Sequence, residues 1–303
     1  MADQLIRATA SGGRIRAVGI ISTELSREAG RRHKMSNIAT ATLGRAMAAS
    51  LLLASNVKQP QARVNLRFAG NGQIGTVFAD AGHDGTVRGY VTHPELEISL
   101  DVSLDSNISS IVGKNGFLDV MKDVGYGTPY TSTVELISGN IGDDVAHFLY
   151  TSEQTPSALL LGEAYDQDGV SVSGGLLLQV LPKAANDESI LELLENRVSK
   201  LQNLPELLQA GKTLVEIMES LLGDLGLVIL PDDRAVKFQC RCTFERMLSA
   251  VKILGEAEIA DMIVTDGGAE ATCHFCSEVY HADQADLQRL LVEIQTDKQP
   301  EEV

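Results

Sequence analysis

The sequence lacks tryptophan, and only 4% of its 303 residues are aromatic. Its core must therefore rest on aliphatic side chains, because hydrophobic residues still make up 44% of the chain and charged residues 22%, as is ordinary for a globular protein. A chain of this length favours two domains over one, since a single hydrophobic core stops growing near about 250–300 residues.

Positive charge is also scarce. With 25 Lys and Arg against 41 Asp and Glu, the formal net charge is -16. Phosphate backbones repel so acidic a chain unless basic residues gather locally. The strongest basic cluster, Arg31–Lys34, is predicted to form a solvated loop or internal salt bridges. We therefore expect no nucleic acid among the partners.

Long apolar runs are missing too. The most apolar stretches, Ala46–Ala54 and Leu225–Leu230, are shorter than the roughly 20 residues of a membrane-spanning helix. The N-terminal segment does not combine a basic start with an apolar run, as a signal peptide would. We therefore expect a cytoplasmic protein with no membrane partner. In a reducing compartment, clustered cysteines are more often metal ligands or redox groups than structural disulfides.

Familiar catalytic motifs do not occur. We find no nucleophile elbow and no His-Glu-x-x-His motif, and the histidines are scattered singly. The glycine-rich segment Gly70–Gly75 lacks the Lys-Ser/Thr pair of a phosphate-binding loop and lies between predicted strands, so it indicates a hairpin turn. We therefore expect that the chain is not an enzyme.

Residues 1–182 show mainly strand patterns with tight turns. In Arg63–Phe68 apolar residues alternate with polar ones, which places them on opposite faces of a sheet. Ser36–Ala54 instead has helical spacing and much alanine, which suits a helix packed closely against that sheet. The remaining predicted elements are strands at Leu5–Ala10, Arg14–Ile21, Ile74–Ala79, Thr86–Val91, Thr131–Ile137, Ala158–Tyr165 and Val170–Leu181, and a helix at Asp143–Tyr150.

The pattern changes after Pro182. Residues 183–230 are rich in leucine and acidic residues, and their helical segments end at Gly211 and Gly223. We interpret them as a helical linker whose apolar faces must lie on the sheet of the first domain. Residues 231–303 follow as a small domain that contains all four cysteines. Its predicted helices are Thr243–Leu254, Glu256–Val264 and Ala285–Gln295.

The four cysteines form two close pairs. One residue separates Cys240 from Cys242, two separate Cys273 from Cys276, and 30 residues lie between the pairs. Four thiolates are a preferred ligand set of structural zinc, and the sequence therefore predicts one zinc ion bound by all four. Four buried structural cysteines are the competing interpretation, which suits a single cysteine better than the whole set.

The predicted zinc centre could be sensitive to oxidation as well as stabilise the fold. His274 and His281 are alternative ligands, although four sulfur atoms already complete a tetrahedral site. Oxidants attack thiolates, and a structural zinc contributes on the order of 10 kcal/mol to the folding of so small a domain. Oxidation to disulfides would eject the metal and unfold the last part of the chain. A purely structural, well-shielded zinc is the alternative.

The cysteine spacing resembles that of a known family. Cys-x-Cys, followed after a spacer near 30 by Cys-x-x-Cys in the C-terminal region, is the hallmark of the heat-shock protein 33 family (the 33 kDa chaperonin, a redox-regulated zinc chaperone). The resemblance extends over nearly the whole chain. Its further motifs are Gly30–His33, Ala39–Arg45, Val134–Gly139, Gly142–Asp144, Ser152–Ser157 and Gly174–Gln179.

The resemblance implies an ATP-independent holdase that keeps unfolding and oxidatively damaged clients from aggregating during stress. It implies an inactive, reduced, zinc-bound form. On oxidation, disulfides Cys240–Cys242 and Cys273–Cys276 would form, zinc would leave, and the C-terminal domain would unfold. The linker would then loosen and uncover client-binding surface, with activity tied to a homodimer. The expected fold is α+β: an N-terminal sheet domain with packed helices (1–182), a helical linker (183–230) and a zinc-binding domain (231–303).

Two other functions stay open on the sequence alone. A zinc-ribbon protein that binds nucleic acid or a transcription partner would need a basic face, which Lys237, Arg241, Arg246 and Lys252 offer. A thiol oxidoreductase would use Cys273 and Cys276 as its active pair, but this pair does not follow a strand in a thioredoxin-like βαβ pattern.

Overall fold

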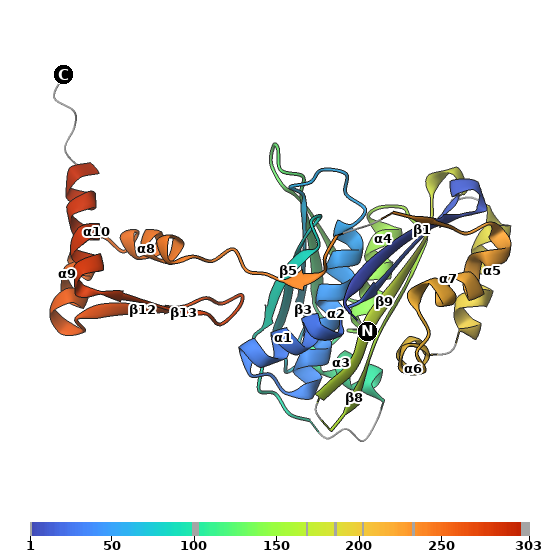
Figure 1. Cartoon of the computed structure of the whole chain (residues 1–303), viewed down its shortest axis with the longest axis horizontal. Coiled ribbons are helices and arrows are strands. Elements are labelled where there is room, and N and C mark those ends of the chain that lie inside the picture. The colour runs from blue at the N-terminus through green and yellow to red at the C-terminus, as the bar shows by residue number, and fades with distance from the viewer. Residues whose placement is uncertain are drawn as a thin grey trace. The chain divides into compact units, whose positions relative to one another are not determined.

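The computed structural model describes residues 2–98, 103–167, 169–184, 187–201, 203–231 and 234–297. The chain is an α+β protein that divides into two compact units, Met1–Gln239 and Cys240–Val303. The larger unit contains two sheets with helices between and over them, and the smaller contains three helices and one hairpin among its described residues (Figure 1).

The first sheet of the larger unit has the strand order β10-β1-β2-β9-β8, and each pair of neighbouring strands in it is antiparallel. A tight turn at Ser11–Gly13 joins its first two strands, as the two glycines predict. We call it sheet A. Its strands are β1 (Gln4–Ala10), β2 (Ile15–Ile21), β8 (Ser157–Asp166), β9 (Gly169–Val180) and β10 (Val228–Leu230).

The second sheet, sheet B, has the order β11-β5-β4-β3-β6-β7 and is antiparallel except where the short β11 runs parallel to β5. The glycine-rich segment after Ala69 is a hairpin turn between paired strands, as predicted. The strands are β3 (Arg63–Ala69), β4 (Thr76–Gly82), β5 (Thr86–Val91), β6 (Phe117–Asp123), β7 (Tyr130–Glu135) and β11 (Lys237–Phe238).

Helix α2 (Asn37–Ala54) lies between the two sheets (Figure 1). The sequence predicts this helix but gives it a single buried face, whereas every residue from Ile38 to Ala54 is buried. A helix covered on all sides needs no amphipathic pattern. Helix α2 is also long and apolar enough to cross a membrane, yet 94% of it is buried inside the fold, as befits a core helix.

Three further helices surround this core: α1 (Thr23–His33), α3 (Leu104–Val112) and α4 (Ile141–Thr151). The basic cluster predicted on a loop instead begins in the last turn of α1, where Arg31 and Arg32 both pair with Glu28. This arrangement confirms internal salt bridges but not the loop. A helix ending with cations is also favoured by its dipole.

The linker helices cover the face of sheet A that is turned away from α2. They are α5 (Glu188–Lys200), α6 (Leu204–Gln209) and α7 (Leu214–Leu222). Alternation along β9 sends Leu177 into the core around α2 and its neighbours Leu176 and Leu178 into the linker core. The apolar faces of the linker helices therefore pack on sheet A, as the sequence predicts. One expectation was wrong, because the end of the linker is not helical: β10 extends sheet A beside β1.

A buried ion pair crosses the interior between α2 and β8. Nε of Arg45 donates to Oε2 of Glu163 at 2.7 Å, and neither side chain is more than 3% exposed. The exposed Asp105 accepts a second hydrogen bond from the same guanidinium at 2.5 Å. Removing Glu163 would leave the buried guanidinium with the exposed Asp105 as its remaining counter-ion, so most of the cost of burying this charge would stay uncompensated.

We expect Glu163→Gln to lower the free energy of unfolding of the larger unit by about 3–5 kcal/mol, because the buried guanidinium keeps its charge. Urea denaturation followed by circular dichroism measures this change. The matched control is Asp119→Asn at the partly exposed Arg67–Asp119 pair, where a loss of about 0–1 kcal/mol is expected. An equal decrease in the free energy of unfolding for the two variants would show that the buried pair stabilises the fold no more than the exposed one.

Candidate metal centre

The cysteines lie on two segments of the smaller unit. Cys240 and Cys242 lie in the segment directly before α8 (Phe244–Lys252), whose first turn is capped by the hydroxyl of Thr243. Cys273 and Cys276 lie in the turn between β12 (Gly268–Thr272) and β13 (Val279–Asp283). The sequence does not predict this hairpin, because its two strands are short and only partly buried.

Backbone hydrogen bonds shape the hairpin turn. The N–H of Cys273 donates to the carbonyl of Glu278 at 2.8 Å, and the N–H of Ser277 donates to the carbonyl of Cys273 at 2.8 Å. Ser277 is left-handed with φ +56°. Such a turn projects the side chains of Cys273 and Cys276 to the same side, where they meet those of Cys240 and Cys242.

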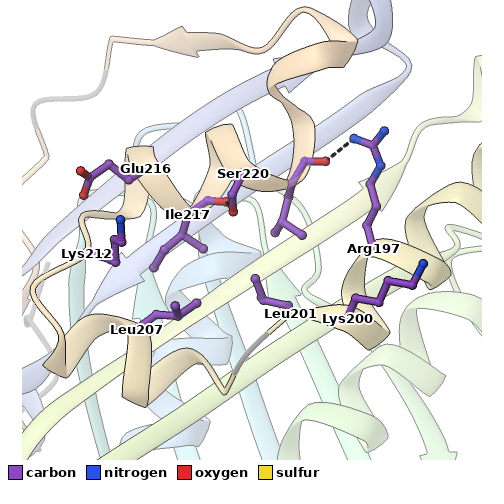
Figure 2. A pocket seen from close by; sticks show the side chains of 9 residues that line it. Arg197, Lys200, Leu201, Leu207, Lys212, Glu216, Ile217 and Ser220 are labelled. Carbon is purple, nitrogen blue, oxygen red and sulfur yellow. Dashed lines mark hydrogen bonds between the residues drawn. The ribbon is translucent and has the colours of Figure 1, made fainter.

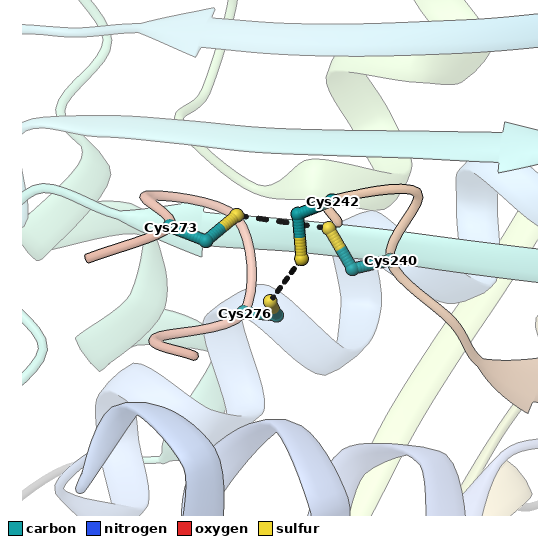
Figure 3. Close-up of side chains that lie close together, drawn as sticks. All are labelled: Cys240, Cys242, Cys273 and Cys276. Atoms are coloured by element: carbon teal, nitrogen blue, oxygen red, sulfur yellow. Dashed lines mark hydrogen bonds between the residues drawn. The ribbon is translucent and has the colours of Figure 1, made fainter. Parts of the chain in front are cut away.

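Together the four sulfur atoms form a compact cluster (Figure 3). The Sγ atoms of Cys240 and Cys273 are 3.7 Å apart, those of Cys242 and Cys276 are 3.4 Å apart, and all four lie within 4.8 Å of one another. A tetrahedral site with metal–sulfur bonds of about 2.3 Å has sulfur–sulfur edges of about 3.8 Å. The cluster therefore has the dimensions of a tetrathiolate metal site.

The electrostatics of the cluster call for a cation. Burial raises the pKa of the thiols of Cys273 and Cys276, which keeps them protonated when no positive charge is near. A bound divalent cation reverses this preference, because it favours the thiolate form. The hydroxyl of Tyr280 on β13 donates to Sγ of Cys242 at 3.2 Å, a partner that the sequence gave no signal for.

Neither candidate histidine belongs to the cluster. Among the described residues, the group that could hold a metal consists of the four cysteines alone. The side chain of His274 is exposed, and Nδ1 of His281 lies 3.4 Å from Oε2 of Glu270, with a side chain that is 71% exposed. His281 is thus engaged at the surface rather than at the sulfur atoms.

The core of the smaller unit is slight. Helices α9 (Glu256–Thr265) and α10 (Gln284–Asp297) complete it. The buried apolar cluster of its described part contains only Met247, Val251, Ile259, Ala282, Leu287, Leu290 and Ile294. Domains of this size seldom gain enough stability from burial alone and usually depend on a metal or a disulfide.

A hollow of about 420 Å³ lies among the linker helices of the larger unit (Figure 2). At its rim the guanidinium of Arg197 donates to the carbonyl of Leu221 at 2.6 Å and to both carboxylate oxygens of Asp224, at 2.6 and 2.7 Å. Arg197 therefore ties the end of α5 to the end of α7. The sequence pattern did not reveal this contact, because it joins residues of two different helices.

Fold and site together define a class: an α+β protein with helices laid over one sheet and a small unit built around a tetracysteine centre. The sequence profile of the family described as Hsp33 protein matches residues 3–283. The chain is 58% identical to the 33 kDa chaperonin of Rippkaea orientalis over 297 residues, covering 98% of this chain and 99% of the relative.

Two further comparisons agree. The 33 kDa chaperonin of a Synechocystis species is 57% identical over 298 residues, again covering 98% of this chain and 99% of the relative. The crystal structure of the 33 kDa chaperonin (heat shock protein 33 homolog) of Thermotoga maritima matches with a TM-score of 0.87 at 30% identity, over 97% of this chain and 99% of that one. The chain belongs to the Hsp33 family.

We expect Cys273→Ser to weaken metal binding at least tenfold, because an alcohol oxygen replaces one of four soft sulfur atoms. Competition with a chromophoric zinc chelator measures the affinity. His274→Ala is the matched control one residue away and should leave the affinity unchanged. The ligand assignment would be refuted if the histidine variant weakened binding and the cysteine variant did not.

Proposed function

We propose that this chain is a redox-regulated, ATP-independent holdase of the cytoplasm, and that Cys240, Cys242, Cys273 and Cys276 hold one zinc ion in its reduced form. The observation that carries the proposal is the convergence of the four sulfur atoms within 4.8 Å of one another. Family membership supports a chaperone, and relatives named chaperonins fit a role without catalysis.

The donor set suits zinc. Four thiolates are soft ligands, and a closed tetrahedral sulfur site is typical of structural zinc. The bound ion would supply charge compensation and a link between the two cysteine turns. Because the apolar core of this unit is slight, the four cysteines would then decide whether the chain from Cys240 onward stays folded.

Oxidation would remove the ligands. In each pair, two thiolates give up two electrons to an oxidant such as a peroxide and form one S–S bond, while the peroxide takes up those electrons and two protons. We propose the pairing Cys240–Cys242 and Cys273–Cys276, as the family resemblance implies. These bonds close very small loops and leave the two turns unlinked. A bond between the turns would instead keep them joined.

The helical linker would carry the switch to the larger unit. Its buried apolar residues, among them Leu214, Ile217 and Met218, rest on sheet A. If the smaller unit unfolds and the linker (183–230) loosens, both this helix face and the sheet beneath it (1–182) become exposed. Apolar patches larger than a few hundred Å² bind other chains, here unfolding clients and a second copy in a homodimer.

Zinc content, free thiols and client aggregation test the proposal together, before and after peroxide treatment at mildly raised temperature. We expect one zinc per chain to be lost as four thiols disappear, and suppression of client aggregation to appear at the same time. Mapping of the disulfides by mass spectrometry distinguishes the proposed pairing from the two pairings that would join the cysteine pairs to each other. Zinc that stays bound through oxidation, with no gain of activity, would leave a structural zinc protein and contradict the switch.

We expect Ile217→Ser to give client-holding activity in the reduced, zinc-loaded protein. Ile217 is 2% exposed, so a buried hydroxyl at this position should weaken the packing of α7 on sheet A by about 2–4 kcal/mol. Light scattering of an unfolding client measures the activity, and zinc content should stay at one per chain. The control is Ile137→Ser, at a side chain that is 52% exposed. Activity that still required oxidation would show that the linker is not the inhibitory element.

A further inference from the structure

A short strap joins the larger unit to the first cysteine. We define the strap as residues 234–239; it contains β11 and ends directly before Cys240. It adds a parallel strand to the edge of sheet B. The N–H of Lys237 donates to the carbonyl of Gly85 at 3.1 Å, and the N–H of Gln239 donates to the carbonyl of Val87 at 2.8 Å.

The side chains of the strap alternate. Val236 is 8% exposed and belongs to the core around α2, and Phe238 is half-buried against the same core. The guanidinium of Arg32 lies 5.4 Å from the centre of the Phe238 ring. Lys237, between the two apolar residues, is exposed. The edge of β5 thus accepts an extended segment with two apolar side chains at alternate positions.

The strap packs so closely against the turn before β5 that this turn needs a glycine. Gly85 has φ +83°, and a Cβ atom on it would lie 2.4 Å from the carbonyl oxygen of Ala235. A side chain there would push away any strand in this position. The backbone of the strap, and not only its side chains, therefore fits this edge closely.

The position of the strap couples it to the metal centre. Its last residue is bonded to Cys240, so unfolding of the C-terminal unit brings unfolded chain directly to the end of the strap. A two-residue strand at a sheet edge has few bonds to hold it. Once the smaller unit unfolds, the strap can fray from this end and then competes poorly for β5.

We propose that the strap is an internal ligand of a peptide-binding edge, and that in the oxidised protein this edge binds an extended segment of an unfolding client by strand addition to β5. Unfolded chains offer the required chemistry, because their backbone groups are unpaired and their apolar side chains are exposed. The inference rests on the proposed function and adds a contact surface on sheet B to the linker face on sheet A.

A fluorescent peptide with the sequence of residues 234–239, Arg-Ala-Val-Lys-Phe-Gln, tests the edge directly on the full-length protein. We expect fluorescence anisotropy to show at least tenfold tighter binding to the oxidised, zinc-free form than to the reduced, zinc-loaded form. Unlabelled peptide in excess should also release bound client. Equal binding to the two forms, or peptide binding with no loss of client, would overturn the inference.

Glycine variants locate the site. In the oxidised protein Gly85→Ala should weaken peptide binding at least tenfold. Gly127→Ala, at φ +73° with no atom within 4 Å of the added Cβ, imposes a similar backbone penalty in the loop between β6 and β7 of the same sheet, and this variant should bind the peptide as the unmodified protein does. Peptide binding that survives Gly85→Ala would place the site elsewhere.

Strap variants test the edge without altering β5. The double substitution Val236→Ser and Phe238→Ser should let the reduced, zinc-loaded protein bind the peptide. Val228→Ser, in the short edge strand β10 where this side chain is 56% exposed, should not. No binding by the double variant would overturn the inference.

Two outcomes separate this inference from the proposed function. An oxidised protein that holds clients but ignores the peptide refutes the edge alone. Release of a dimer by the peptide, with client retained, would assign the edge to a second copy and refute the client assignment.

Discussion

The fold of the C-terminal unit depends on one constraint, the convergence of four sulfur atoms from two segments with 30 residues between them. The buried apolar cluster of this unit is too slight to make it stable by itself. Thiolates in such close contact repel one another unless a cation lies among them. In the proposed function, the atoms that would hold the unit together are also those that an oxidant would attack, so the stability of the unit would depend on their redox state.

The larger unit is built on the opposite principle. Helix α2 is buried on all sides between two sheets, and the Arg45–Glu163 pair crosses its interior, so this part has a core independent of any metal. The linker helices are bound to sheet A by apolar contacts that face away from α2. In the proposed switch, those helices would leave sheet A while the core around α2 stays packed. The covalent path from Cys240 to α7 passes through the strap and β10, two short edge strands that offer little resistance.

Much of this arrangement was readable from the sequence, because it depends on local signals. The cysteine spacing predicts the cluster, glycine turns predict the hairpins, and the apolar faces of residues 183–230 predict helices on a sheet. What could not be read depends on contacts distant in sequence. The complete burial of α2 needs two sheets, and β11 is a strand only because β5 lies beside it. Strand β6 and helix α1 have mixed polar and apolar patterns, so their structure depends on the elements that pack against them. The hydrogen bond from Tyr280 to Cys242 joins strand β13 to the segment before α8, which are 38 residues apart.

We propose that the redox state of the four cysteines controls whether the linker stays on sheet A. Hydrogen–deuterium exchange of the full-length protein tests this control, by following the amides of α7 in the reduced, zinc-loaded form and after oxidation with loss of zinc. We expect slow exchange in α7 before oxidation and at least tenfold faster exchange after it, while amides of α2 stay protected in both forms. Protection of α7 that persists after the C-terminal unit has unfolded would show that the cysteines do not control the linker.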